Sequence, residues 1–599
     1  MNIIPKVKKI TKKGNKIHFN IPLKIQKEEC PFDFEAIFSP CKNLFQLTDS
    51  SGVIHFIHDM NLEHEAYILE VTDQGIQIAS SSASGSLYGL YTLYQLLNQD
   101  DIYEMEIEDF PDLKIRGIMI DISRNKIPTM DQMMEMISEF SFMKINHLQF
   151  YVEGFSFYIK SLPAGEYLTP MTIEEFCYLQ DYAAKLGIDL VPNMNGLGHM
   201  TDWLSLDEYK HLAEKEDGFI AWGHHFKAST LNPLDPSSLK LVKTMYRELL
   251  SRSQSEYFNM NLDEPFELGQ GKSKEECDRT SKVKVYLDYV TKLSDFVKKY
   301  DKEPMMWGDV VVNHPEAFQS IPKNVILCDW GYDFDYPFKD HGLALHRNQV
   351  PFLLAPGTSS WNSFASRNKD MKETTFQACI SAKQSDGLGV MTTDWGDFGH
   401  LQYYPFSLRG FLYCAALSWG ENLSDDELND WLDVYLMNEQ GLASTLHHLS
   451  TYSELENQYV YNSTLTFQTV MFTDPDLKTP IKLRSDFLKN QILARPMTDK
   501  AIQDILNLCE QEKKFLNQKN GLIPEEILNC IRMIEFSVRF QHKMIHQIKL
   551  DDQDLYAINH IISKHQILWL QRNRKGGLEQ SLSRLISLKE IIEFLLIQV

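Results

Sequence analysis

Short β-rich runs alternate with longer amphipathic stretches from about residue 115 to residue 393, and this rhythm limits the fold more than any other feature. Eight candidate strands occur in this region, and most are followed by a stretch with helical spacing of its apolar residues. The candidate strands are Arg116–Ile122, His147–Val152, Ile188–Asn193, Tyr257–Leu262, Pro304–Trp307, Val325–Asp329, Phe352–Ala355 and Gly389–Thr393.

The stretches between these strands predict helices. Examples are Met130–Phe142, Ile173–Leu186, Ser238–Leu250, Val283–Lys299 and Glu373–Lys383. Successive strand–helix units of this kind predict an α/β fold, a closed (β/α)8 TIM barrel. A doubly wound parallel sheet is the alternative, but it more often carries a Gly-rich phosphate loop after its first strand. The segment Ile122-Ser-Arg-Asn-Lys-Ile-Pro is unlike such a loop.

The region before the barrel has a different pattern. Three short strand-like runs, Lys16–Ile21, Ala66–Val71 and Gly75–Ala79, accompany one helical pattern over Ser86–Leu97. This mixture predicts a small α+β domain over residues 1–110.

Strand signals fade after about residue 422. Long charged and apolar segments follow, and they predict an α-helical domain over residues 423–599, behind a barrel domain over residues 111–422. The segments are Asp425–Met437, Lys500–Leu516, Pro524–Ile548 and Ser581–Ile597.

Net charge and cysteine content limit which classes of partner and cofactor can be expected. The chain has 59 basic and 82 acidic residues, a net charge of −23, which argues against nucleic acid or a membrane surface as the main partner because both need a basic face. No apolar run approaches the roughly 18 residues of a membrane-spanning helix. Nine scattered cysteines include no CxxC pair and no Cys/His cluster with zinc-ligand spacing, so we expect reduced thiols and no metal. The N-terminus lacks the apolar segment of a signal peptide, and a cytoplasmic location is expected.

The active site of a barrel lies at the C-terminal ends of its strands. Polar and aromatic residues follow each predicted strand. They are Asp121-Ile-Ser-Arg124, Tyr151-Val-Glu153, Asn195-Gly-Leu-Gly-His199, Asp263-Glu264, Trp307-Gly-Asp309, Asp329-Trp330-Gly-Tyr332, Ser360-Trp361-Asn362 and Asp394-Trp395-Gly-Asp397.

Four of the nine tryptophans stand at the ends of four consecutive strands, at 307, 330, 361 and 395. Core packing is one explanation, because strand ends in barrels are packed as well. Four equivalent positions favour a shared pocket instead. Aromatic planes contact the apolar faces of pyranose rings while carboxylates and amides bind the hydroxyls, so the pattern predicts a sugar site.

Asp263 and Glu264 are adjacent carboxylates at the end of the fourth predicted strand. Like-charge repulsion between them is expected to raise the pKa of at least one. Ordinary glycosidases place two carboxyl groups roughly 5–5.5 Å or more apart, across the scissile bond. Adjacent residues serve more easily if the substrate supplies its own nucleophile. A 2-acetamido oxygen would attack the anomeric carbon, Asp263 would orient that group and Glu264 would protonate the leaving oxygen.

With these motifs the chain resembles the glycoside hydrolase family 20 β-N-acetylhexosaminidases, in the branch with a helical C-terminal domain. The resemblance covers the leading domain and the barrel through about Trp419. The segments that carry it are Ser86–Leu97, Arg116–Arg124, Gly196–His199, Asp263-Glu264, Leu353–Arg367 and Thr392–His400.

The resemblance implies a role for individual residues. Glu264 matches the general acid/base, and Asp263 matches the residue that positions the acetamido group. Arg124 matches the arginine that binds the outer hydroxyls of the terminal sugar, His199 a histidine that supports the acid, and Glu153 the acidic residue that orients it. The pocket wall and the far hydroxyls are assigned to Trp307, Trp330, Trp395 and Asp397.

Two departures from the family pattern stand out. Many members have Tyr-x-Asp after the seventh strand, where this chain has Ser360-Trp361-Asn362. We therefore assign Trp361 and Asn362 to the sugar site and expect Tyr332 to hold the acetamido carbonyl. The common His-x-Gly-Gly-Asp-Glu lead-in is replaced by Asn259-Met-Asn-Leu before Asp263.

Together these features predict an exo-acting retaining β-N-acetylhexosaminidase that removes terminal GlcNAc or GalNAc without a cofactor. One alternative is a non-catalytic carbohydrate-binding relative with the same barrel, which the altered motifs favour. An endo-acting hydrolase of acetamido sugars is another, which Arg124 and a blind aromatic pocket disfavour. The helical domain could pack on the barrel, complete the site for the leaving group or form a homodimer interface.

Overall fold

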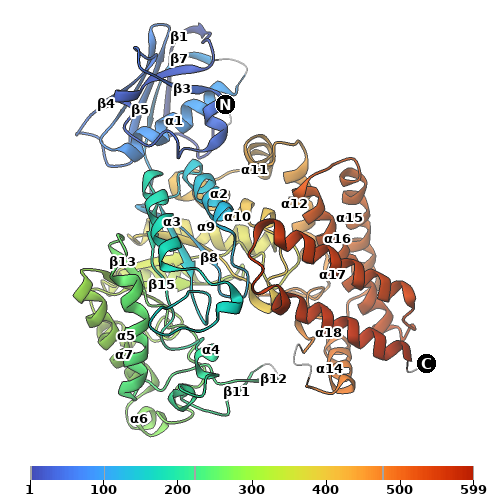
Figure 1. The fold of residues 1–599 in the computed structure, drawn as a ribbon. Coiled ribbons are helices and arrows are strands. Elements are labelled where there is room, and N and C mark those ends of the chain that lie inside the picture. The colour runs from blue at the N-terminus through green and yellow to red at the C-terminus, as the bar shows by residue number, and fades with distance from the viewer. Residues whose placement is uncertain (1–2, 100–101, 222–223, 475–477, 598–599) are drawn as a thin grey trace.

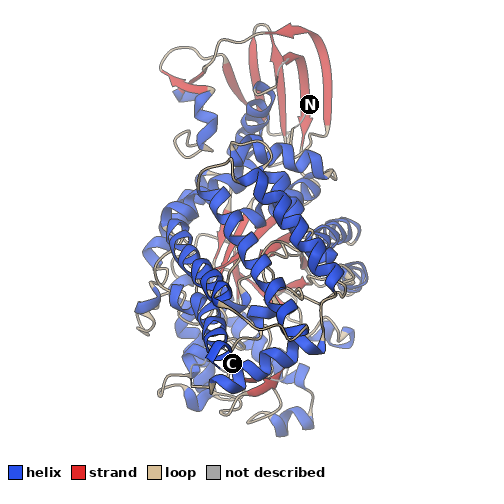
Figure 2. Cartoon of the chain, turned by 90° about the vertical axis from the view of Figure 1, so that its right-hand side faces the viewer, coloured by secondary structure: helices blue, strands red, loops and turns tan. Residues whose placement is uncertain are grey.

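The computed structural model describes residues 3–99, 102–221, 224–474 and 478–597. Figure 1 shows three parts: an N-terminal sheet, a central barrel, and a group of long helices along one side of the barrel. Seen from that side in Figure 2, the long helices lie in front of the barrel strands. A TIM barrel with a small leading domain and a helical C-terminal region is therefore confirmed.

The N-terminal part is a seven-stranded sheet in the order β1-β7-β5-β6-β4-β2-β3. One helix, α1 (Ala83–Leu97), packs against β5 and β6, and the side chain of Ser82 caps its first turn. The strands are β1 (Lys9–Ile17), β2 (Leu23–Gln26), β3 (Phe45–Thr48), β4 (Ile54–His58), β5 (Tyr67–Thr72), β6 (Gly75–Ser80) and β7 (Ile102–Asp109).

The first strand differs from its prediction. The predicted run Lys16–Ile21 contributes only its first two residues to β1, which begins at Lys9. β1 lies at the edge of the sheet and most of its side chains are exposed, so apolar alternation does not mark it. Its lysines pair instead with acids on the neighbouring strand, as Lys13 does with Glu106 at 2.5 Å.

Eight parallel strands form the barrel, and all eight predicted strands are confirmed with small shifts at their ends. β13 stops at Asn259, before the predicted Leu262, because Asn261 and Leu262 turn to left-handed backbone with φ of 58° and 67°. A backbone bridge between Asn193 and Asn259 joins the first and last strands of the sheet. The strands are β8 (Ile115–Asp121), β9 (His147–Tyr151), β10 (Asp189–Val191), β13 (Tyr257–Asn259), β14 (Glu303–Trp307), β15 (Ile326–Trp330), β16 (Phe352–Ala355) and β17 (Gly389–Asp394).

Helices surround these strands, and the five predicted examples are present. α9 begins at Asn368, earlier than the predicted Glu373, because its first turn is polar and buries Asp370 without apolar spacing. The larger helices are α2 (Met130–Phe142), α3 (Ile173–Lys185), α5 (Pro236–Leu250), α7 (Lys282–Val297), α8 (Phe338–Arg347), α9 (Asn368–Gln384) and α10 (Pro405–Trp419). The loops carry the short helices α4 (Thr201–Leu204) and α6 (Lys274–Arg279) and the pair β11 (Phe219–Ala221) and β12 (His224–Phe226).

The C-terminal part is helical, as predicted. Its long helix α16 packs between α15 and α17. The predicted Asp425–Met437 is one α-helix continued by a π-helical segment from Asp433 to Met437. The helices are α11 (Asp425–Leu432), α12 (Leu442–Ser450), α13 (Gln468–Met471), α14 (Ile481–Ala494), α15 (Asp499–Leu516), α16 (Leu522–Ile545), α17 (Asp552–Arg572) and α18 (Leu578–Ile597).

The link between α17 and α18 is joined to the barrel loop that follows β8. Thr129 donates its N–H to the carbonyl of Arg572 at 2.9 Å, and Arg574 donates to the carbonyl of Ile127 at 2.8 Å. Ser581 on α18 donates to the carbonyl of Gly399, in the loop that follows β17. The helical part therefore contacts two loops at the C-terminal end of the barrel.

All nine cysteines are free thiols, and seven are buried. Among the described residues, no helix combines the length and the apolar character needed to cross a membrane.

Candidate active site

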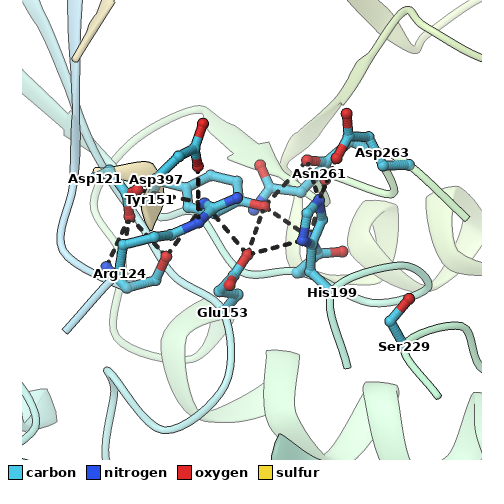
Figure 3. A network of polar contacts seen from close by, with 12 residues as sticks. Asp121, Arg124, Tyr151, Glu153, His199, Ser229, Asn261, Asp263 and Asp397 are labelled. Carbon is cyan, nitrogen blue, oxygen red and sulfur yellow. Dashed lines mark hydrogen bonds and ion pairs between the residues drawn. The ribbon is translucent and has the colours of Figure 1, made fainter. Parts of the chain in front are cut away.

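Charged side chains from several strand ends meet in one network at the C-terminal end of the barrel (Figure 3). Asp121 and Tyr151 end β8 and β9, and the remaining members follow strands in loops. The structure brings together six of the predicted site residues here, one of which is Glu264, 3.2 Å from His199 Nε2. The other five are Arg124, Glu153, His199, Asp263 and Asp397.

Arg124 lies between three carboxylates. Its guanidinium nitrogens lie 3.3 Å from Asp121, 3.3 Å from Glu153 and 3.4 Å from Asp397. The rings of Tyr151 and Trp395 each have their centroid 5.1 Å from the guanidinium carbon. Burial lowers the pKa of Arg124, but the three carboxylates outweigh this effect, and the net pKa is well above its usual value. The result is a fixed cation with its donors held at the rim of the barrel.

His199 connects this cation to the acidic pair. Its Nδ1 lies 3.2 Å from Glu153 Oε2, and its Nε2 lies 3.3 Å from Asp263 Oδ2 and 3.2 Å from Glu264 Oε2. Burial lowers the pKa of His199, but the charges of Glu153 and Asp263 outweigh it and raise the pKa well above its usual value. We therefore treat His199 as an imidazolium that donates from both nitrogens.

Glycines before His199 allow its loop to approach the acidic pair. A Cβ on Gly198 would stand 2.0 Å from the carbonyl oxygen of Asp263, and one on Gly196 would stand 2.3 Å from the hydroxyl of Tyr246. His199 itself has φ of 55°, in the left-handed region. The Gly-Leu-Gly-His sequence thus provides the close backbone contact that places the imidazole beside Asp263.

Asp263 is 5% exposed and receives several hydrogen-bond donors. Asn195 Nδ2 donates to its Oδ1 at 2.9 Å, and the hydroxyl of Tyr151 lies 3.1 Å from its Oδ2. Burial raises the pKa of Asp263, but His199 and Arg124 outweigh burial and the net pKa is lowered. Asp263 is therefore an ionised carboxylate with a fixed orientation.

The repulsion expected to raise the pKa of at least one member of the pair does not raise that of Asp263, because the cation of His199 stands beside it. Raised pKa values occur at neighbouring acids instead. Burial raises the pKa of Glu153 to about 7, of Asp309 to about 7 and of Asp397 to about 6. For Asp309 the negative charge of Asp263 adds to the burial effect.

Glu264 is the more accessible member of the pair, with a side chain that is 33% exposed. Its backbone N–H donates to Asp309 Oδ2 at 3.0 Å, and its φ is 47°. The two residues before Asp263, Asn261 and Leu262, also have left-handed backbone, although neither is a glycine. These are the positions of the two glycines in the His-x-Gly-Gly-Asp-Glu pattern. The backbone shape that glycines adopt freely is thus kept here by other residues.

The predicted aromatic residues contact one another above the barrel interior. Trp395 packs against Trp307, with ring centroids 5.8 Å apart, and its Nε1 donates to the hydroxyl of Tyr332 at 2.7 Å. Tyr332 stacks on Trp330 at 5.1 Å and contacts the edge of Trp361 at 4.9 Å. The tryptophans from four strand ends thus share one aromatic cluster.

The members of this cluster differ in access to solvent. Trp330 is partly exposed, Trp395 is 7% exposed, and Trp307 and Trp361 are fully buried. Asn362 is 3% exposed, and its Oδ1 has no hydrogen-bond partner among the described residues. Trp361 therefore packs against Tyr332, and Asn362 is buried with its backbone carbonyl accepting from the hydroxyl of Ser463, so the structure does not bring either residue to Arg124 and His199.

Several members of the network were not assigned to the site from sequence. Tyr151, Asn195 and Asp309 contact Asp263 or Glu264 directly. Asp121 contacts Arg124, and Asn261 accepts a hydrogen bond from Trp307 Nε1 at 2.9 Å. All five stand at or just after predicted strands, so their position was a signal. Their contacts, however, depend on which strand ends face one another across the barrel.

Lys126 holds the loop of Arg124 against the loop of Asp397. Its ammonium group donates to the carbonyl oxygens of His400 at 3.1 Å and Gln402 at 2.6 Å. The ring of Trp569 on α17 has its centroid 5.5 Å from the same nitrogen. Burial lowers the pKa of Lys126 to about 8. The helical part thus contributes to the surroundings of this connection.

Comparison with known proteins gives several sequence relatives. Over 294 residues, 44% of this chain, it is 25% identical to beta-hexosaminidase subunit beta of Entamoeba histolytica. It is 24% identical to a beta-hexosaminidase of Akkermansia muciniphila, over 57% of this chain and 78% of that protein. The chain spans about half the length of the first curated relatives it matches, 50% for the Entamoeba protein and 49% for a Vibrio furnissii beta-hexosaminidase.

Solved structures share the fold. A chitobiase of Flavobacterium johnsoniae superposes with a TM-score of 0.60 and 18% identity, covering 99% of both chains. A family 20 exo β-N-acetylglucosaminidase of Vibrio harveyi has a TM-score of 0.60 and 18% identity, over 74% of this chain and 77% of that chain.

Family profiles match most of the N-terminal part and the barrel. The profile described as glycosyl hydrolase family 20, domain 2, matches residues 1–110. The profile of the glycosyl hydrolase family 20 catalytic domain matches residues 113–429, which is more than half of the chain. The chain, with its acidic pair at the end of the fourth barrel strand, belongs to glycosyl hydrolase family 20.

Proposed function

We propose that this protein is an exo-acting retaining β-N-acetylhexosaminidase that removes terminal β-linked GlcNAc or GalNAc by substrate-assisted catalysis. The observation that carries the proposal is the position of His199 Nε2, 3.3 Å from Asp263 and 3.2 Å from Glu264. One imidazolium shared by both carboxylates holds the two acids next to each other at the end of one barrel strand. Such a pair suits a substrate that brings its own nucleophile better than a double displacement by two opposed carboxylates.

The reaction divides between the two acids. The acetamido carbonyl oxygen attacks C1 while the bond from C1 to the leaving oxygen breaks, and Glu264 gives its proton to that oxygen. The ionised carboxylate of Asp263 accepts the acetamido N–H and stabilises the positive oxazolinium ring. Water then attacks C1 and gives a proton to Glu264 while the bond from C1 to the oxazolinium oxygen breaks, so the acetamido group is restored and the configuration at C1 is retained. The exposed side chain of Glu264 and the buried one of Asp263 fit these two roles.

Arg124, Asp397 and Glu153 support the exo mode. The guanidinium and the Asp397 carboxylate, 3.4 Å apart, present donors and acceptors to vicinal hydroxyls of one sugar residue. Glu153 links Arg124 to His199, so sugar binding and the acidic pair share one network. We propose that the non-reducing end of the glycan contacts this cluster.

Tyr332 is our proposed partner for the acetamido carbonyl. Its hydroxyl accepts a hydrogen bond from Trp395 Nε1, so its own proton points elsewhere and can be donated. Trp330 and Trp395 would form the wall against the sugar ring, and Trp307, which is fully buried, would support Trp395 from behind. Trp361, which is buried against Tyr332, would act by supporting it, and the buried Asn362 follows Trp361 in the same loop.

A paired assay tests the reaction type. An aryl β-GlcNAc and an aryl β-glucoside with the same leaving group are offered to the purified protein. We expect hydrolysis of the first only, because the glucoside lacks the internal nucleophile. Equal hydrolysis of both would exclude the acetamido mechanism. Binding of GlcNAc without any turnover would support the non-catalytic alternative.

A chitin oligosaccharide tests the exo mode. We expect GlcNAc to appear as the first product, one residue at a time. Release of disaccharides or longer fragments at early times would support the endo-acting alternative.

We also propose the domain limits 1–110, 111–422 and 423–599. β7 ends at Asp109 and β8 begins at Ile115, while α10 ends at Trp419 and α11 begins at Asp425. Free thiols at all nine cysteines are compatible with the proposed cytoplasmic location.

A further inference from the structure

Three potential metal ligands meet between two helices of the C-terminal part. Asp499 is in the first turn of α15, and His542 and His546 are in or just after the last turn of α16. One ligand atom of each residue lies within 4.8 Å of the others. The pairing follows from topology, because α15 and α16 are consecutive packed helices and the start of one faces the end of the next.

Spacing along α16 places both imidazoles on one face. Residues four apart in a helix are neighbours on its surface. The two rings have centroids 4.6 Å apart and an interplanar angle of 50°. His546 Nε2 lies 2.6 Å from Asp499 Oδ1, and His542 Nε2 lies 3.8 Å from the same oxygen. Both imidazoles therefore direct the same ring nitrogen toward one carboxylate.

A simple hydrogen bond explains only half of this arrangement. The contact of His546 with Asp499 is a hydrogen bond, but the 3.8 Å separation of His542 from Asp499 is too long for one. In a metal site with bonds of about 2.0–2.2 Å, neighbouring ligand atoms stand roughly 3–3.5 Å apart. Small side-chain rotations would bring all three atoms to that spacing, and the side chains have room for them. They are 69%, 39% and 40% exposed for Asp499, His542 and His546.

Local charge also favours a cation at this place. The negative end of the α16 dipole lies at its C-terminus, where the two histidines stand. The nearby ammonium group of Lys543 is paired with Asp551 at 3.1 Å and Asp554 at 2.7 Å. Its positive charge is therefore balanced by the first turn of α17.

We propose that Asp499, His542 and His546 bind one first-row transition-metal ion of the Zn²⁺ type. Two imidazoles and one carboxylate suit zinc, copper or nickel, whereas Ca²⁺ and Mg²⁺ prefer all-oxygen sites. Three protein ligands leave a position for water. The ion would join the start of α15 to the end of α16 and stabilise the helical part. The sequence-based expectation of no metal considered Cys/His spacing only and not a carboxylate supplied by another helix.

Titration of metal-stripped full-length protein with ZnCl₂ alone tests the proposal by calorimetry. We expect one equivalent of Zn²⁺ to bind to the site. His542→Ala, His546→Ala and Asp499→Asn should each weaken this binding at least about tenfold. Zn²⁺ should also raise the unfolding temperature of the wild type more than that of the variants, because it binds the folded state.

A matched control separates this site from ordinary surface histidines. His55 is an exposed imidazole 3.1 Å from one carboxylate, Glu29, on the N-terminal sheet. His55→Ala should leave the bound equivalent and its affinity unchanged. The double variant His542→Ala/His546→Ala is first shown by circular dichroism to be folded. The proposal is overturned if this variant binds Zn²⁺ with the affinity of the wild type. Equally tight binding of Mg²⁺ by the wild type would overturn it too.

Discussion

Nε2 of His199 lies 3.3 Å from Oδ2 of Asp263, and this contact organises the charges of the site. The same nitrogen lies 3.2 Å from Oε2 of Glu264. One imidazolium is thus shared by two adjacent carboxylates. The charge of His199 keeps the pKa of Asp263 low despite burial, so the buried acid stays ionised. The two acids therefore differ in environment: Asp263 is buried, and the side chain of Glu264 is 33% exposed.

Replacing His199 should change the pH dependence of the proposed reaction. In His199→Asn the largest opposing charge is gone and Arg124 alone remains as a nearby cation, so burial raises the pKa of Asp263. Asp263 must be ionised to act, so activity should be lost at a higher pH as the solution is acidified. The acidic limb of the profile of kcat/KM against pH should therefore move upward.

His341→Asn is the matched control for this experiment. His341 Nδ1 lies 3.1 Å from Asp329 Oδ2, also at a barrel strand end but outside the Arg124 network. Its replacement should leave the acidic limb in place. An unmoved limb in His199→Asn would show that the imidazolium does not set the charge state of Asp263.

Substitutions of Glu264 and of Asp263 should reduce activity in different ways. Glu264→Gln should lose most activity toward glycosides whose leaving group needs a proton, and less toward aryl substrates that leave as stable anions. Asp263→Asn keeps the acid but removes the charge that stabilises the oxazolinium, a loss on the order of 10²–10³-fold in kcat. That loss should be nearly independent of the leaving group. A leaving-group series measures both slopes, and equal slopes would disprove the division of roles.

Tyr332→Phe should lower kcat more than it raises KM. The hydroxyl would hold the acetamido carbonyl as it becomes the nucleophile, so its contribution grows toward the transition state. We expect a loss of about tenfold, typical of one hydrogen bond. Steady-state kinetics with an aryl β-GlcNAc provide the measurement.

Tyr336→Phe is the control, because its hydroxyl already donates to Asp329 at 2.6 Å. It should leave kcat near the wild-type value. If Tyr332→Phe behaves like this control, another group holds the carbonyl.

Lys126→Met should weaken substrate binding through Arg124 and Asp397. The ammonium group joins their two loops through the carbonyls of His400 and Gln402, and without it the loops can separate. Because Arg124 and Asp397 would bind ground state and transition state alike, KM should rise about tenfold with a smaller change in kcat. Lys126→Arg, which keeps the charge, should recover part of the loss.

Lys302→Met provides the comparison, since Lys302 also donates to a backbone carbonyl, that of Ser255, but next to the N-terminal end of β14. It should leave KM unchanged. Equal effects of the two substitutions would point to general destabilisation rather than to positioning.

Glu139 should make stability depend on pH between about 4.5 and 7. Burial raises its pKa from 4.5 to about 7 in the folded protein. Within this window the folded state binds more protons than the unfolded state, so the free energy of unfolding falls as pH rises. The contribution of Glu139 to the free energy of unfolding is fully present below the pKa of Glu139 in the unfolded state. It is lost as the pH rises above the pKa of Glu139 in the folded state. It amounts to about 3 kcal/mol.

Glu139→Gln removes this dependence and can still accept the hydrogen bond from Tyr404. Relative to the wild type, the variant should gain stability between pH 5 and pH 7.5, measured by thermal unfolding. A constant difference between the two proteins at both pH values would contradict the raised pKa.

The order of strands and helices was readable from sequence because each element carries its own apolar period. The eight barrel strands and the helices α2, α3, α5 and α7 were predicted close to their observed limits for this reason. Strand-end positions likewise indicated Arg124 and His199, since all strands of a barrel end on one side. The edge strand β1 escaped prediction because its exposed side chains do not alternate.

Charge states and partners were decided only by the tertiary structure. Repulsion between Asp263 and Glu264 was expected because they are neighbours in sequence, but His199 comes from another loop and its charge lowers the pKa of Asp263. A pKa depends on burial and on every charge within a few ångströms. Periodicity along a chain carries neither quantity, because both arise when distant segments meet. The sequence by itself therefore determined which residues stand at the mouth of the barrel, and the closed fold decided which of them touch and which are ionised.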